Sequence, residues 1–485
     1  MGNGLAHLML VIWPFVCVMV FRKMPLERAL IWCILGGYLF LPPTTNFNLP
    51  LIPTMDKVSI PNLSVLLILF FVLREKVQLR PDSRIATVLV FGLILSGIPT
   101  VLTNTDPIIF RRLAGSEPII FAVDRLPGQS FRDLGAVLMG QLLAIVPFLL
   151  ARQYLSTDKG LREILLAFMI GGLIYSIPSL IEIRLSPQIN VWVYGFFQHS
   201  FEQMIREGGF RPIVFLQHGL WLALFICTAL MAAIALARVN PPVSPLKAWG
   251  IVAYLAVLLY LCKSLASLAY GVAMVPVLMF APPRLQVLIA AGFALVAVGY
   301  PMLRNAGVVP LEAILTRAEA INPERAFSLR YRFYNEEALL ERAAERPLFG
   351  WGGYGRNLIR HIETGEILTI PDGRWIIIFG TFGWIGYLCE FGLLALPLAL
   401  MGIYIFRHRD TALSPWIAPL CLILGITLMD MLLNATLTPL TWMTAGAILG
   451  HAEKRMPWRS DEPRHAIRSA VMGGAAGSGG RRTVL

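Results

Sequence analysis

The stretch IVFLQHGLWLALFICTALMAAIAL, residues 213–236, contains no Asp, Glu, Lys or Arg. About 17–25 mostly apolar residues are enough for a helix to cross the hydrocarbon core of a bilayer. The whole chain has this character, because 56% of its 485 residues are hydrophobic and only 14% are charged. A soluble domain carries about a quarter charged residues, so this chain has too little polar surface to cover itself in water. We therefore predict an all-α, polytopic membrane protein.

Apolar runs of spanning character recur along the chain, and we expect about 12–13 transmembrane helices. They lie near residues 5–21, 28–42, 60–74, 85–103, 133–152, 162–181, 213–236, 246–262, 264–281, 284–303, 375–406, 415–433 and 436–450. Every odd-numbered run is followed by Lys or Arg, as at Arg22 and Lys23 after the first. Excess positive charge marks cytoplasmic loops, so the N-terminus is predicted on the outer side.

This topology divides the chain into four parts. Residues 1–303 hold ten transmembrane helices with short loops, and 304–374 form a large, partly helical periplasmic loop. Residues 375–452 hold the last transmembrane helices, and 453–485 form a basic, disordered cytoplasmic tail. The net charge of +12 is explained by the cytoplasmic flanks, and we expect no nucleic-acid partner. The six cysteines lie within or at the ends of apolar runs, so neither a disulfide framework nor a thiolate metal site is expected.

The sequence lacks the motifs of several soluble enzyme classes. It contains no Gly-x-x-x-x-Gly-Lys-Ser/Thr loop, no His-Glu-x-x-His, no Cys-x-x-Cys and no Asp-x-Asp. A cytoplasmic ATPase or a zinc enzyme is therefore not expected, and we predict neither a cofactor nor a metal site. The remaining polar residues of interest lie at the predicted outer face.

The first group of such residues is GGFRPIVFLQH, residues 208–218. Arg211 lies at the membrane boundary, and Pro212 suits the first position of the following helix. His218 is then expected two helical turns deeper, on about the same face as Arg211. An ionisable group inside a span is a functional candidate by default, so both are predicted to contact substrate. The alternative is a snorkelling Arg211 and a His218 satisfied by a neighbouring helix.

The second group is SLRYRFYNEEALLERAAERPLFGWGGYGRN, residues 328–357. Residues 328–345 are predicted to form an amphipathic helix on which Arg330 and Tyr334 share a face, while Arg332 points elsewhere. Arg330 and Arg332 are candidate substrate-binding residues. The alternative is a solvated helix whose arginines pair with neighbouring glutamates.

The third group precedes the long apolar stretch that begins near residue 375. His361 and Asp372 are candidate general bases at the membrane surface. Asp372 alternatively caps the helix that follows. Lys263, in a tight outer turn, is either a boundary lysine or a further substrate contact.

These features together resemble the O-antigen ligase and surface-polysaccharide polymerase family of bacterial envelopes. The similarity lies in the glycine- and arginine-containing segment 208–218, the large late outer loop, the arginine-bearing helix followed by PLFGWGGYG, and the Gly-rich span after it. It covers roughly residues 205–450. Such proteins are GT-C-like glycosyltransferases of the bacterial inner membrane.

The resemblance implies a metal-independent, multi-pass enzyme whose active face is periplasmic. Its donor would be an oligosaccharide on undecaprenyl pyrophosphate, and its acceptor another glycan or a lipid. Membrane lipids and envelope-polysaccharide assembly proteins would be its other partners. By matching motif positions, Arg211, Arg330 and Arg332 would hold the pyrophosphate, since arginine presents a fixed fork of donors to phosphate oxygens.

The sequence departs from the family at the base. Family members often place a His-Asn pair before the Gly-rich span, whereas this chain has Pro371-Asp372-Gly373, with His361 upstream. The base is therefore Asp372 or His361, and both polymerase and ligase activities stay open. The alternative function is a transporter or flippase of a lipid-linked saccharide or another amphipathic anion.

Overall fold

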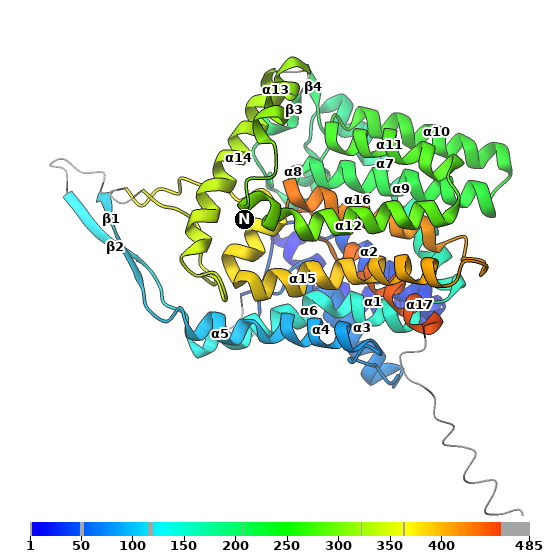
Figure 1. Cartoon of the computed structure of the whole chain (residues 1–485), viewed down its shortest axis with the longest axis horizontal. Coiled ribbons are helices and arrows are strands. Elements are labelled where there is room, and N and C mark those ends of the chain that lie inside the picture. Colours follow the sequence, from blue (N-terminus) through cyan, green and yellow to red (C-terminus); the bar gives the residue numbers. More distant parts are fainter. Residues whose placement is uncertain are drawn as a thin grey trace, which may run out of the picture.

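The computed structural model describes residues 2–48, 53–114, 120–206, 208–321, 323–361 and 364–456. Within these ranges nearly all regular structure is helical, and the long helices lie side by side in one bundle (Figure 1). The prediction of an all-α polytopic membrane protein is confirmed. The predicted tail 453–485 lies outside the described residues beyond Met456, and its first residues belong to a helix that ends at Arg455.

The first half of the chain contains eight α-helices and a strand pair among the described residues. These elements are α1 (Gly4–Lys23), α2 (Leu26–Phe40), α3 (Ser59–Leu67) with the π-helical turn η1 (Ile68–Val72), α4 (Arg84–Leu95), α5 (Gly97–Leu102), β1 (Ile108–Ala114), β2 (Ile120–Leu126), α6 (Phe131–Tyr154), α7 (Asp158–Leu185) and α8 (Ile189–Tyr194).

The second half begins with short irregular elements and continues with long helices. These elements are η2 (Glu202–Met204), β3 (Ile205–Arg206), β4 (Gly209–Phe210), α9 (Gly219–Val239), α10 (Pro245–Leu261), α11 (Leu265–Phe280), α12 (Pro283–Asn305), α13 (Leu311–Ile321), α14 (Pro323–Ala344), α15 (Arg374–Arg407), α16 (Ile417–Leu433) and α17 (Pro439–Arg455).

Each predicted span coincides with helix in the structure. Among the described residues, seven helical segments are long and apolar enough to cross a membrane unaided: Gly4–Lys23, Arg84–Leu102, Phe131–Tyr154, Asp158–Leu185, Gly219–Val239, Pro283–Arg304 and Arg374–Arg407. Four further apolar segments are shorter, namely Ser59–Val72, Pro245–Leu261, Leu265–Phe280 and Ile417–Leu433. The shorter helices need to pack against full-length neighbours to stay within the hydrocarbon core of the membrane.

The loops with excess positive charge gather at one end of the bundle. Arg28 Nε donates to Glu163 Oε2 over 2.8 Å, and Arg152 Nη1 donates to Glu453 Oε2 over 2.8 Å. Arg284 Nη2 donates to the carbonyl of Thr411 over 3.2 Å. These contacts join the ends of helices that are far apart in the sequence.

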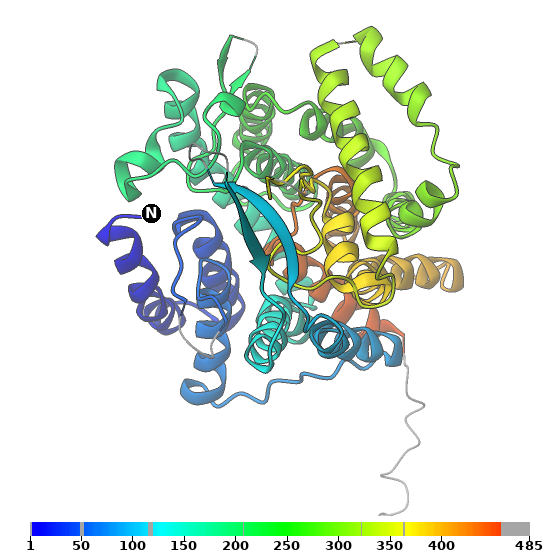
Figure 2. The same cartoon turned by 90° about the vertical axis from the view of Figure 1, so that its left-hand side faces the viewer.

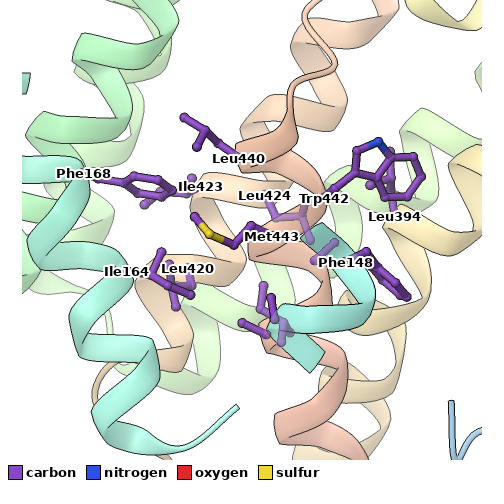
Figure 3. Close-up of a cluster of buried hydrophobic side chains, with 14 of the residues drawn as sticks. Phe148, Ile164, Phe168, Leu394, Leu420, Ile423, Leu424, Leu440, Trp442 and Met443 are labelled. Carbon is purple, nitrogen blue, oxygen red and sulfur yellow. The ribbon is translucent and has the colours of Figure 1, made fainter. Parts of the chain in front are cut away.

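One cluster of buried hydrophobic side chains lies between α6, α7, α15, α16 and α17 (Figure 3), and the wider core also includes α2 and α9. Phe148 of α6 meets Trp442 of α17 edge to face, with ring centroids 6.0 Å apart. The two helices approach closely because Gly446 and Gly450 face α6: a Cβ on Gly446 would stand 2.0 Å from the carbonyl oxygen of Phe148. Small residues four apart are a common way to bring membrane helices into backbone contact.

The opposite end of the bundle carries the hairpin and the helices of the longest connections. The β1–β2 hairpin projects away from the helices, and α13 and α14 cover part of the same end (Figures 1 and 2). The predicted helix over 328–345 is therefore confirmed as the larger part of α14. This end of the molecule also contains most of the candidate residues.

The apolar run predicted near residues 375–406 is helical in the structure, as α15, but this helix is not straight. The ribbon is sharply bent at Gly383, whose backbone has φ 64° and ψ −163°, a region adopted almost only by glycine. In a straight helix the Cα atoms of Arg374 and Glu390 would be roughly 24 Å apart. Instead Arg374 Nε donates to Glu390 Oε1 over 2.7 Å. The first turns of α15 therefore fold back along its long second part.

The PLFGWGG segment packs against this bend. The backbone N–H of Trp351 donates to the carbonyl of Gly380 over 2.9 Å, and that of Trp384 donates to the carbonyl of Pro347 over 2.8 Å. A Cβ on Gly383 would lie 2.4 Å from the carbonyl oxygen of Leu348. The bend and the Gly-rich loop thus fix the position at which α15 begins.

Candidate functional site at the outer end of the bundle

The segment 211–218 is not the start of a helix, contrary to the prediction. Helix α9 begins only at Gly219, and His218 is its N-cap residue. The preceding residues are irregular, with Val214 at φ 52°, and Ile213 and Val214 are fully buried. Irregular backbone at this depth in a membrane protein requires partners for its polar groups.

Side chains from three other segments supply those partners. The Glu182 carboxylate accepts the backbone N–H groups of Ile213 and Val214 over 2.7 and 2.8 Å. Gln198 Nε2 donates to the Val214 carbonyl over 2.8 Å. Lys57 Nζ donates to the carbonyl of Phe215 over 2.8 Å. The segment is thereby held in one conformation.

Lys57 is unusual because its side chain is buried, with 3% of the residue exposed. Burial lowers the pKa of its ammonium group to about 7, against the opposing influence of neighbouring Asp56. Sequence analysis did not select Lys57, although a lone lysine just before an apolar run was a visible signal.

Arg211 lies at the start of the irregular segment and is 7% exposed. Its Nη2 donates to the carbonyl of Lys263 over 2.9 Å, and Lys263 Nζ donates to the carbonyl of Arg206 over 2.8 Å. Lys263 has φ 50°, as expected for the tight turn between α10 and α11. The structure thus brings the predicted pair Arg211 and Lys263 into direct contact.

His218 makes hydrogen bonds through both ring nitrogens. Nδ1 accepts the backbone N–H of Leu220 over 2.9 Å, and Nε2 lies 3.3 Å from Oε1 of Gln203. Because the Gln203 oxygen can only accept, Nε2 carries the ring proton and the imidazole is a donor toward the outer loop.

The surroundings of His218 keep it neutral. Burial, the neighbouring His199 ring, and the positive charges of Arg211 and Arg332 lower its pKa to about 3. The two arginines come from different parts of the chain, and both lower the pKa of the His218 imidazole. His218, at the start of α9, therefore lies within electrostatic range of Arg332, near the middle of α14.

Arg332 and Asp372 form the centre of this region. Arg332 Nε lies 3.5 Å from Asp372 Oδ2, and 27% and 34% of the two side chains are exposed. Both line a small cavity together with Glu336, Leu339, Ile370, Gly373, Ile376, Leu432 and Leu433. Burial raises the pKa of the Asp372 carboxyl, and the charge of Arg332 opposes that shift. A partly accessible carboxylate beside an arginine is suited to proton transfer next to a bound anion.

Asp372 is positioned from two sides. The backbone N–H of Ile370 donates to Asn335 Oδ1 of α14 over 2.8 Å, which ties the loop to α14. The backbone N–H of Arg374 donates to the carbonyl of Asn434 over 3.2 Å, which ties α15 to the end of α16. The predicted capping alternative is not what the structure has, since Gly373 is the N-cap and no side chain caps the helix.

Two other predicted residues lie elsewhere. Arg330 is on the exposed side of α14 and pairs with Glu319 of α13, with an Nη2–Oε2 distance of 3.4 Å. His361 lies in a turn where its Nδ1 accepts the backbone N–H of Thr364 over 3.3 Å. Neither Arg330 nor His361 lines the cavity that contains Arg332 and Asp372.

The buried carboxyl groups that were not predicted as site residues include Glu336 and Asp430. Glu336 lines the Arg332–Asp372 cavity and is 7% exposed. Asp430, near the end of α16, accepts hydrogen bonds from Asn434 Nδ2 over 3.0 Å and Thr436 Oγ1 over 2.6 Å. Asp430 is the one acidic residue in an apolar helix, a signal that was available. No sequence signal distinguished Glu336 from the other glutamates of α14.

The described residues contain no group of three or more His, Cys, Asp or Glu side chains placed to hold a metal ion. Comparison with known proteins adds no assignment, because neither a protein-family model nor a curated protein matches this chain.

Proposed function

We propose that the protein is an integral membrane glycosyltransferase. It moves a glycan from undecaprenyl pyrophosphate onto an acceptor glycan or lipid at the periplasmic face of a bacterial inner membrane. The observation that carries the proposal is the pairing of Arg332 with the Asp372 carboxylate at a shared cavity. The positive charges of Arg211 and Arg332 both lower the pKa of nearby His218. The motif resemblance of residues 205–450 supplies the donor class.

The cationic residues account for recognition of the donor. Arg332 lies partly exposed in the cavity, and its guanidinium suits phosphate oxygens in a way that a lysine ammonium does not. Arg211 and Lys263 support the positive potential from the other side of the cluster. These charges stabilise the negative charge that develops on the pyrophosphate as the glycosidic bond breaks.

Asp372 is the better placed of the two candidate bases. It adjoins Arg332, whereas His361 already accepts a hydrogen bond within its own turn. In the proposed step Asp372 takes the proton of the acceptor hydroxyl, and the hydroxyl oxygen forms the new bond to the anomeric carbon. The electron pair of the broken bond leaves with the pyrophosphate oxygen.

A transporter or flippase is the second candidate, and one observation favours it. Asp430 is buried within the bundle, where ionisable residues often mark a substrate or ion pathway. A neighbouring cavity is lined by six threonines, namely Thr228, Thr427, Thr436, Thr438, Thr441 and Thr444. This activity predicts movement of a lipid-linked saccharide across liposomes without any change in its length.

The deciding experiment uses the purified full chain in lipid nanodiscs with undecaprenyl-pyrophosphate-linked repeat units and EDTA. A ladder of products on a gel is the result expected of a polymerase. Products that appear only when lipid A core is added identify a ligase. If neither acceptor is extended, and the same donor crosses liposomes that contain the protein, glycosyl transfer is excluded in favour of transport.

A further inference from the structure

Glu336 lies in the candidate site but has no role in the proposed transfer described above. It is one helical turn after Arg332 on α14, and both residues line the cavity that Asp372 closes from the opposite side. Residues four apart on a helix lie on one face. The cavity is thus lined by two carboxyl groups from different segments of the chain, of which Asp372 pairs with Arg332 and Glu336 with Arg304.

The surroundings of the two carboxyl groups differ. Glu336 is more than nine-tenths buried, and Asp372 keeps 34% of its side chain exposed. Tyr300 Oη donates to Glu336 Oε2 over 3.3 Å, while Arg304 Nε is 3.9 Å from the same oxygen. The other oxygen, Oε1, is buried, and the side chain of Trp375 is a further polar neighbour that lowers the pKa of this carboxyl group.

The charged and titratable groups around Glu336 come from each neighbouring element. Arg304 and Tyr300 belong to α12, Glu337 to α14 itself, and Asp372 to the loop before α15. Burial raises the pKa of Glu336 to about 7, with Arg304 opposing the shift and Glu337 adding to it. Near neutral pH a large fraction of Glu336 therefore carries a proton, whereas Asp372 is paired with Arg332.

Two carboxyl groups with environments that separate their proton affinities are the usual arrangement of an acid and a base in one site. We propose that Glu336 is the general acid of the transfer, a role that rests on the proposed glycosyltransferase function. It protonates the pyrophosphate oxygen that leaves the anomeric carbon while Asp372 takes the proton of the acceptor hydroxyl.

The step is balanced in atoms and charge. The bond from the anomeric carbon to the pyrophosphate oxygen breaks, and its electron pair stays on that oxygen, which receives the Glu336 proton. The acceptor oxygen loses its proton to Asp372 and bonds to the anomeric carbon. Exchange with water then restores the proton to Glu336 and removes one from Asp372.

The test compares three full-length proteins in nanodiscs: wild type, Glu336→Gln and the control Glu341→Gln. Glu341 is an exposed residue of the same helix. Transfer from undecaprenyl-pyrophosphate-linked repeat units is measured between pH 5.5 and 9, and thermal unfolding shows that each variant is folded. General acid catalysis typically contributes about 10²–10⁴-fold.

We expect the wild-type rate to fall as the pH rises through about 7, because Glu336 then loses its proton. E336Q should be slower by about 10²-fold or more and should lack this alkaline decline, whereas E341Q keeps both rate and profile. An E336Q protein with the wild-type rate and profile overturns the acid role alone.

A second measurement separates this failure from failure of the proposed function. Binding of inorganic pyrophosphate is followed by calorimetry in two buffers of different ionisation heat at pH 7. An anion beside Glu336 favours its protonated form. Proton exchange by pyrophosphate itself is common to the three proteins, so the uptake in excess of that in E336Q is the quantity compared, and it should be present in wild type and E341Q. Equal proton uptake in all three proteins overturns the placement of Glu336 at the anion site. A third outcome is proton uptake that occurs only in the proteins with Glu336, while wild type transfers no glycan. This outcome places the anion beside Glu336, but it overturns the glycosyltransferase function and the acid role with it.

Discussion

The two sides of helix α14 carry similar residues and face different surroundings. We call Arg332, Glu336 and Asp372, which line the cavity, together with Asn335, which binds the backbone of Ile370, the inner set. We call Arg330, Tyr334, Glu341 and His361, all exposed, the outer set. Each set contains an arginine, an acid and a candidate base or polar partner, so residue type alone does not separate them.

The difference lies in burial and partners. Arg330 pairs with Glu319 where both side chains are more than half exposed, and such pairs contribute little energy in solvent. Arg332 is 27% exposed and faces a carboxylate and a cavity. A charge in a partly enclosed site interacts more strongly with a bound anion than one in open water. The comparison therefore predicts that substitutions in the inner set reduce activity, whereas substitutions in the outer set do not.

The largest effect is expected for Asp372→Asn, which removes the proposed base. Transfer should fall by about 10²–10⁴-fold, as for loss of a general base. Because the pKa of Asp372 is raised, the wild-type rate should decline as pH falls through that raised value, where the carboxylate becomes protonated. The rate of product formation against pH measures both effects.

His361→Gln is the matched change in the outer set, and its rate should stay within about threefold of wild type. A protein in which H361Q abolishes transfer and D372N does not would assign the base to His361 instead.

Arg332→Ala should lower transfer by about 10²–10³-fold, since it removes a cation aimed at developing charge. Arg330→Ala, two residues away on the same helix, should change the rate by less than about threefold. Initial rates at saturating donor compare the two. Similar losses in both variants would mean that the two faces of α14 do not differ in function.

Gly383→Ala tests whether the bend in α15 positions the inner set. Its backbone conformation costs a non-glycine residue about 1–3 kcal/mol, and the new Cβ would lie 2.4 Å from the Leu348 carbonyl oxygen. We expect a lower thermal unfolding midpoint and a lower rate. Gly392→Ala is the control on the same helix, because its Cβ would meet only the Leu89 side chain, at 3.4 Å or more. An unchanged thermal unfolding midpoint in G383A would contradict the bent backbone conformation at Gly383.

Asn335→Ala removes the hydrogen bond that ties the Asp372 loop to α14. Misplacement of the base should reduce transfer by about tenfold, with a loss of about 1 kcal/mol in stability. Tyr334→Ala on the exposed side, where 71% of the residue is exposed, should affect neither. Parallel measurements of rate and unfolding midpoint show whether the inner side alone is sensitive.

Much of the architecture followed from the sequence because its signals are local. Hydrophobic content and run length identify helices that cross a bilayer, and the Lys and Arg pattern orders the loops. The periodicity over 328–345 located α14, and its two faces were separated correctly for Arg330 and Arg332. The glycine-rich PLFGWGG segment forms a tight loop in which Gly350 and Gly352 have positive φ.

The candidate site was only partly accessible to that reasoning. Arg211 and Lys263 were selected for their places at membrane boundaries, and the structure joins them by a hydrogen bond. His218 was placed inside a helix because periodicity carries no information on the side chains of Glu182, Gln198 and Lys57 that hold residues 213–215 in irregular form.

The sequence by itself determined the membrane class, the helical segments and the residue types available at the outer end. Only the tertiary structure decided which of those residues meet. Arg332 and Asp372 are forty positions apart, and they come together because α15 folds back at Gly383 and because Asn335 fastens the intervening loop. The same packing buries Glu336 and leaves Arg330 exposed. Burial and proximity set the proton affinity and the electrostatic strength of a side chain, and both are properties of the packed chain.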